Sequence, residues 1–175
     1  MRMSWLGIMS PELSLSIQYA VNAPELPRWR VRRWVERALS HAFAAREQSH
    51  LPAPEAHSVS LTLRFVDEAE GQELNQAYRG RDYATNVLTF EYGVDPEGCI
   101  HGDIVLCIPV LHREAEAQHK PLLHHAAHLT SHGVLHALGY DHIDPDEARI
   151  MEALETAILS SQHIPDPYTP LIMPH

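Results

Sequence analysis

The segment "PLLHHAAHLTSHGVLHALGYDH", residues 121–142, predicts a long helix that ends in a tight turn. Pro121 suits the first turn of a helix, where the N–H that proline lacks would have no partner. Gly139 suits the position just past a helix end, because glycine adopts the left-handed backbone conformation without strain. We therefore expect a helix over residues 121–138, followed by a turn that reverses the chain.

Four stretches that precede this helix predict strands. They are residues 12–21, 58–66, 86–92 and 102–108. The second alternates apolar and polar side chains, which is typical of a half-buried strand. Its apolar face would consist of Val59, Leu61, Leu63 and Phe65. The stretch 102–108 is nearly all apolar, which predicts a strand in the centre of the sheet.

Helical patterns separate and follow these strands. The further helices are expected over residues 26–44, 68–78 and 109–120, and after residue 144. Asp67 and Asp144 are suited to cap helix N-termini, because an Asp side chain accepts hydrogen bonds from unpaired backbone N–H groups. The last helix has Ile150, Leu154 and Ile158 on one apolar stripe.

The order β-α-β-α-β-β-α-α-α predicts an α+β fold with a mixed sheet of about four strands packed with helices. A chain of 175 residues suits one domain with a hydrophobic core. We expect a single domain over residues 13–168. Residues 1–12 would be a loosely ordered N-terminal extension, and residues 169–175 a C-terminal tail. No stretch is apolar over the roughly 18 residues that a membrane span needs.

Three histidines in the opening segment predict a metal centre. His132 and His136 are four apart, so their rings lie on one helix face, one turn apart. The turn at Gly139 would return His142 toward the same point. Three histidines leave a coordination position for water, which is typical of catalytic sites. The alternative is that the histidines are hydrogen-bonded residues of an apolar core.

His128 lies four residues before His132 and extends the same stripe. It cannot share an ion with His136, because eight residues span about 12 Å along a helix axis. The glycine turn favours the set His132, His136 and His142. His128 then contacts a metal ligand without binding the ion itself, or faces the substrate, or is simply a histidine on the helix face.

The frame H-x-x-x-H-x-x-G-x-x-H has the spacing of the metzincin proteases, so the fold would contain a metzincin-like metal-binding helix and turn. In those proteases a glutamate general base follows the first histidine. This chain has Gly133 there, which has no acid–base capacity. A metallopeptidase therefore stays an alternative only if a carboxylate such as Asp103 or Asp141 acts instead.

The charge distribution disfavours a general nucleic-acid binder, because the formal net charge is −10. Five of the thirteen basic residues nevertheless lie in "RWRVRRWVER", residues 28–37. This cluster is either a local basic surface or a solvated helix face.

The segment "HGVLHALGYDH", together with "YRGRDYATNVLTFEY" (78–92) and "GDIVLC" (102–107), resembles the YbeY family of bacterial rRNA-maturation endoribonucleases. The resemblance covers roughly residues 13–168. It implies a metal-dependent endoribonuclease that acts on single-stranded RNA in 16S rRNA 3′-end maturation and ribosome quality control. It also implies a cytoplasmic protein that associates with the ribosome or small subunit and its proteins, with neither DNA nor a membrane as partner.

The resemblance also implies site residues. The metal ligands map onto His132, His136 and His142, with one zinc ion per chain expected and other divalent transition metals possible. A functional arginine maps onto Arg79, whose planar fork of donors suits a phosphate. Asp141 either caps the helix end or orients a ligand histidine, as outer-shell carboxylates commonly do. Two alternatives stay open, a metallopeptidase and a non-catalytic ribosome assembly factor with a structural metal.

Overall fold

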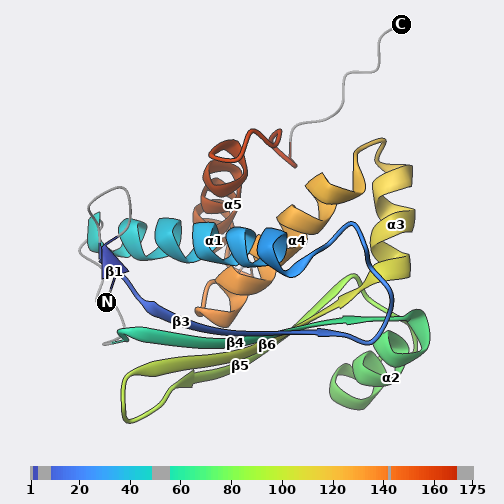
Figure 1. The fold of residues 1–175 in the computed structure, drawn as a ribbon, viewed down its shortest axis with the longest axis horizontal. Coiled ribbons are helices and arrows are strands. Elements are labelled where there is room, and N and C mark those ends of the chain that lie inside the picture. Colours follow the sequence, from blue (N-terminus) through green and yellow to red (C-terminus); the bar gives the residue numbers. More distant parts are fainter. Residues whose placement is uncertain (1, 4–8, 49–55, 142, 169–175) are drawn as a thin grey trace, which may run out of the picture.

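The computed structural model describes residues 2–3, 9–48, 56–141 and 143–168 (Figure 1). Its elements are β1 Arg2–Met3, β2 Met9–Ser10, β3 Glu12–Tyr19, α1 Arg28–Gln48, β4 Ser58–Val66, α2 Glu68–Arg79, β5 Val87–Val94, β6 Cys99–Cys107, α3 Ile108–Ala117, α4 Leu122–Ala137 and α5 Pro145–Ser160. The predicted order of strands and helices is confirmed from β3 onward. Sequence reasoning missed the short antiparallel pair of β1 with β2, because two-residue strands leave no periodic pattern.

The main sheet has four strands in the order β3-β4-β6-β5. The strands β3, β4 and β6 are parallel, and β5 pairs antiparallel with β6. The predicted mixed four-stranded sheet is therefore confirmed, with the apolar strand β6 in an inner position. The side chain of Asp95 closes the β5–β6 hairpin by accepting hydrogen bonds from the backbone N–H groups of Glu97 and Cys99.

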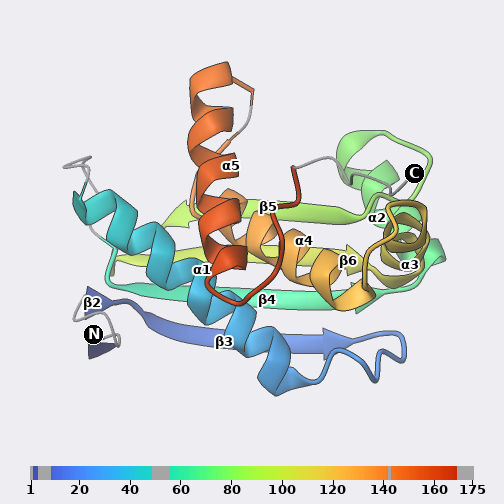
Figure 2. The same cartoon turned by 90° about the horizontal axis from the view of Figure 1, so that it is seen from above.

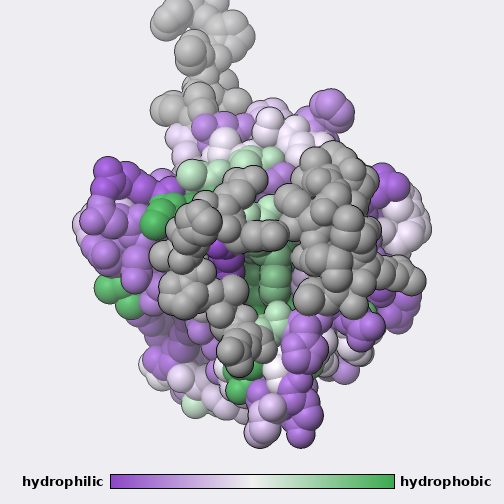
Figure 3. Space-filling model, turned by 90° about the vertical axis from the view of Figure 1, so that its left-hand side faces the viewer, coloured by the Kyte–Doolittle hydropathy of each residue, from purple (hydrophilic) through white to green (hydrophobic). Residues whose placement is uncertain are grey.

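Helices α1 and α4 pack on one face of this sheet, and α5 packs against both of them. Figures 1 and 2 show α1, α4 and α5 on that face, with α2 at one end of the sheet. The predicted apolar face of β4 points into this layer and is at most 2% exposed; it consists of Val59, Leu61, Leu63 and Phe65. Seen from the end in Figure 3, the described surface is mostly hydrophilic, with apolar side chains visible near its centre. In the described residues, no helix combines the length and the apolar character that crossing a membrane requires.

Capping residues set the helix ends that bound the site. The carboxylates of Asp67 and Asp144 accept backbone N–H groups of the first turns of α2 and α5, as predicted. Gly139 has φ 98°, in the left-handed region, and follows the end of α4 as expected. The helix predicted over 121–138 therefore exists, and it ends in a glycine turn.

Two glycines lie in the contact between helix α4 and strand β6: Gly133 of the helix faces the strand, and Gly102 of the strand faces the helix. A Cβ atom on Gly133 would lie 2.7 Å from Cγ2 of Ile104, and one on Gly102 would lie 2.8 Å from Cβ of Ala137. Atoms cannot approach that closely without a shift of the backbone or of a β-branched side chain. These contacts fix how α4 is rotated above the sheet.

A buried histidine joins α3, α4 and the start of β5. The Nε2 atom of His125 lies 2.9 Å from Oε1 of Glu114, and Asn86 donates to the same carboxylate. His125 is only 3% exposed. Burial lowers its pKa, although the hydrogen bond to Glu114 opposes the shift. The neutral imidazole is therefore part of the packed structure.

We expect this histidine to make the protein less stable as pH falls below about 6.5, the ordinary pKa of histidine. The pKa of His125 is lower in the folded chain, so the unfolded chain binds the proton first and gains stability. His125→Gln should flatten this part of the pH dependence, measured as the free energy of unfolding in urea at several pH values. His112→Gln, on the exposed side of α3, should keep the wild-type slope. An unchanged slope in His125→Gln would contradict the assignment.

Candidate metal centre

Helix α4 presents a line of histidines on one side. The ring centroids of His132 and His136 lie 4.6 Å apart, and those of His128 and His132 lie 6.3 Å apart. His132 and His136 are partly exposed, while the residues between them are buried. The structure therefore brings together the two ligands expected from the spacing of four. His142 lies outside the described residues, so the complete three-histidine set stays a prediction.

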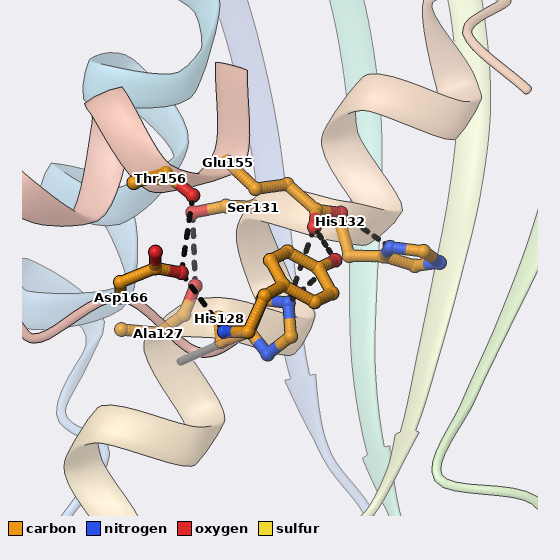
Figure 4. A network of polar contacts seen from close by, with 8 residues as sticks. Ala127, His128, Ser131, His132, Glu155, Thr156 and Asp166 are labelled. Atoms are coloured by element: carbon orange, nitrogen blue, oxygen red, sulfur yellow. Dashed lines mark hydrogen bonds and ion pairs between the residues drawn. The ribbon is translucent and has the colours of Figure 1, made fainter. Parts of the chain in front are cut away.

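A carboxylate from α5 lies against this line of histidines, as Figure 4 shows. Glu155 is 0% exposed. Its Oε1 atom lies 2.5 Å from Nδ1 of His132, and its Oε2 atom lies 3.2 Å from Nε2 of His128. The hydroxyl of Tyr168, from the segment after α5, donates to Oε2 as well.

The electrostatics of this cluster decide which atoms carry protons. Burial alone would raise the pKa of Glu155, but hydrogen bonds from His128 and His132 lower it to about 2. Burial and the neighbouring Glu155 carboxylate raise the pKa of Tyr168, so its hydroxyl stays protonated. An ionised Glu155 can only accept hydrogen bonds, so Nδ1 of His132 is the donor. The other ring nitrogen of His132, Nε2, is then the one with a lone pair for a metal.

Sequence reasoning missed Glu155. The expected apolar stripe of α5 is wrong at Ile150, which is 51% exposed, and right at Ile158. The buried residues of α5 are Met151, Glu155, Ile158 and Leu159. If the buried face of α5 had been known, the presence of a glutamate on that face would have identified Glu155. A buried carboxylate has to be hydrogen-bonded or paired, and the nearest histidine-rich helix is α4.

A second grouping of possible ligands exists among the described residues. One side-chain atom each from His128, His132 and Glu155 lie within 4.8 Å of one another. These atoms already form hydrogen bonds with each other, however. We therefore interpret Glu155 as the partner that orients the histidines, and Nε2 of His132 with the ring of His136 as the side that fits a metal ion.

Gly133 faces the sheet and not the histidines. Its Cα lies against Ile104, and the structure has no room for any side chain there. A glutamate at this position, as in the metzincin frame, would clash with the central strand. Asp103 does not supply the carboxylate that is missing at position 133. It lies between Gly102 and Ile104 along β6, so its side chain points to the opposite face of the sheet, where Tyr92 donates a hydrogen bond to it. The metallopeptidase reading is therefore not favoured.

Two further expected site residues, Asp141 and Arg79, lie near the C-terminal ends of α4 and α2. Asp141 follows the glycine turn and is half-buried; burial, together with the Asp141 charge, raises the pKa of Glu91 on β5. Arg79 is the last residue of α2 and is exposed, next to the left-handed Gly80. None of the described residues forms a hydrogen bond or ion pair with the guanidinium of Arg79. The roles of Asp141, Arg79 and His128 stay predictions.

Comparison with known proteins identifies one family. The sequence model described as "Endoribonuclease YbeY" matches residues 16–163. Proteins named Endoribonuclease YbeY are similar along nearly their whole length. The one from Bordetella pertussis is 61% identical over 160 residues, which is 91% of this chain and 98% of that protein. The one from Bordetella petrii is 64% identical over 160 residues, covering 91% of this chain and 99% of that protein.

Two more distant similarities were also found. The Endoribonuclease YbeY of Thiobacillus denitrificans is 49% identical over 161 residues, covering 91% of this chain and 99% of that protein. A solution structure of a Thermotoga maritima protein covers 89% of this chain and 99% of its own, with 20% identity and a TM-score of 0.48.

The close contact of Gly133 with β6 predicts that Gly133→Ala destabilises the fold. Alanine normally favours a helix by about 1 kcal/mol over glycine, but the added methyl group would meet Ile104 at 2.7 Å. We expect a net loss of about 1–3 kcal/mol, as for other overpacked cores. The measurement is the free energy of unfolding by denaturant titration.

The background Ile104→Ala supplies the control, because it removes the group that the new methyl meets. There Gly133→Ala should cost less than in the wild type. Equal costs in both backgrounds would show that Ile104 is not what demands glycine.

Proposed function

We propose a function from the premise that this chain belongs to the Endoribonuclease YbeY family: it is a metal-dependent endoribonuclease that cleaves single-stranded ribosomal RNA. The family match and the relatives support hydrolysis of RNA. The observation that carries the metal dependence is the pair His132 and His136, one turn apart, with the buried Glu155 behind His132. We further propose that the cleavage serves 16S rRNA 3′-end maturation and ribosome quality control, in the cytoplasm and with the small subunit and its proteins as partners.

The residues present fit a single zinc ion or a similar divalent transition metal. His132 and His136 would hold it, with His142 as the proposed third ligand. Neutral imidazoles leave the charge of the ion undiminished, and such an ion polarises a phosphoryl oxygen and acidifies water. This chemistry suits phosphodiester hydrolysis and makes a glutamate at position 133 unnecessary.

The protein's own groups bind and orient the substrate in this proposal. Arg79 would hold a phosphate through two parallel N–H donors, which a lysine point charge would not do. Asp141 would orient a ligand histidine near the glycine turn. Because the chain carries a net charge of −10, its affinity for RNA should come from these local groups and fall steeply with salt.

Replacing His136 tests the metal centre. His136→Ala should lose bound metal and at least a hundredfold of the cleavage rate on single-stranded ribosomal RNA, because one ligand is gone. The measurements are metal content by mass spectrometry and RNA cleavage on gels. His112→Ala is the matched control on an exposed helix face. Cleavage that persists in His136→Ala and in metal-stripped protein would contradict the nuclease proposal. An intact metal-binding protein without hydrolysis would favour the assembly-factor alternative.

Replacing Arg79 tests the phosphate contact separately. Arg79→Ala should keep its metal but lose tenfold or more in kcat/KM for RNA, whereas Arg79→Lys should recover only part of the rate. Arg113→Ala is the control, since Arg113 is exposed and paired with Glu68, at the opposite end of α2 from Arg79. Unchanged kinetics in Arg79→Ala would remove this residue from the site.

A further inference from the structure

The segment after α5 folds back onto the line of histidines. The side chain of Asp166 accepts hydrogen bonds from Thr156 at 3.3 Å and from the backbone N–H of Tyr168 at 2.8 Å. This places the Tyr168 ring edge-on to His128, with ring centroids 5.6 Å apart. Its hydroxyl then reaches Glu155 (Figure 4). Three parts of the chain, α4, α5 and residues 164–168, thus meet at one carboxylate.

Both oxygens of Glu155 are engaged, and they have different neighbours. Among the described residues, Oε1 accepts a hydrogen bond only from Nδ1 of His132, at 2.5 Å. Oε2 is shared by His128 and Tyr168. The oxygen that contacts the expected metal ligand is therefore reserved for it, while the other oxygen anchors the carboxylate. A carboxylate held at one oxygen directs the second with little freedom.

A purely structural role would be a costly use of this position. Glu155 is fully buried between Met151 and Ile158, where an apolar residue of similar volume would pack as well. Replacing buried charged groups by apolar ones is often neutral or stabilising. The Nδ1–H of a metal-binding histidine commonly donates to a carboxylate, which fixes the ring and makes Nε2 more basic.

We propose that Glu155 is the positioning residue of the metal centre: it accepts the Nδ1 proton of His132 and so directs Nε2 toward the ion, while Tyr168 holds Glu155 in place. The inference rests on the proposed function only in taking His132 as a ligand. It adds that the segment 164–168, far from the histidine motif in sequence, is part of the centre.

The first test needs neither metal nor RNA. In the metal-free wild-type protein at about pH 8, where histidine is neutral, two-dimensional ¹⁵N–¹H NMR should show His132 as the Nδ1–H tautomer. In Glu155→Leu the Nε2–H tautomer, which dominates in free histidine, should appear. A wild-type His132 in the Nε2–H form would overturn the proposal. A purely structural link between α4 and α5 would give the same tautomer, so the affinity for Zn²⁺ is what separates the two roles.

The second test measures affinity for Zn²⁺ by competition with a chromophoric chelator. Glu155→Leu and Glu155→Gln should each weaken Zn²⁺ binding by about 10–100-fold, the usual effect of losing such a partner. Tyr168→Phe should weaken it less, by about threefold to tenfold, because the ring stays and only the hydroxyl is lost. Glu152→Gln, exposed on the same helix, should bind like the wild type. So should Tyr92→Phe, which removes a tyrosine–carboxylate bond on the opposite sheet face.

The outcomes separate this proposal from the proposed function. Wild-type Zn²⁺ affinity in both Glu155 variants would overturn the positioning role and leave the nuclease intact. A wild type that binds Zn²⁺ but cleaves no RNA would end the nuclease proposal and leave the positioning role standing. If Glu155→Leu fails to fold, the Zn²⁺ affinity of Glu155→Gln still decides the question.

Discussion

The contact of α4 with the central strand β6 constrains the rest of the structure. Gly133 and Gly102 let the helix lie directly on the strand, with Ile104 and Ala137 filling the space that side chains would otherwise take. A helix held at this distance has only one possible rotation. His132 directly precedes Gly133 and His136 follows it by three positions, so both side chains point sideways, away from the sheet. Core packing therefore sets the direction of the metal-binding side chains.

The same contact explains why the histidine frame differs from that of a protease. In the metzincin pattern the residue after the first histidine supplies a carboxylate, but in this fold that position is buried against Ile104 of the sheet. The carboxylate that does reach the histidines comes from α5, and it contacts the protonated side of the imidazole. It is the one buried carboxylate among the described residues. Its position suits orientation of a ligand, whereas activation of water would have to come from the ion and from other groups.

Much of this arrangement was predictable, because local spacing carries it. Strand β4 alternates with period two, and its apolar face is the buried one. Asp67, Asp144 and Gly139 mark helix ends through hydrogen bonds and backbone angles that involve only near neighbours. The pairing of His132 with His136 follows from the pitch of a helix. The prediction for α5 is wrong at Ile150 because Ile150 and Met151 are both apolar, and the sequence does not show which of the two a neighbouring element will cover.

The sequence by itself therefore determined the order of the elements and the histidine pair, since each depends on residues within a few positions of one another. The mixed sheet was predicted from that order of elements. Only the tertiary structure decided that Gly133 lies against Ile104, that Asp103 points to the far face of the sheet, and that Glu155 and Tyr168 converge on His128 and His132. These contacts join residues from 13 to 40 positions apart. No periodicity within one element encodes them, because they depend on how α4 packs on the sheet and how α5 and the C-terminal segment pack against α4.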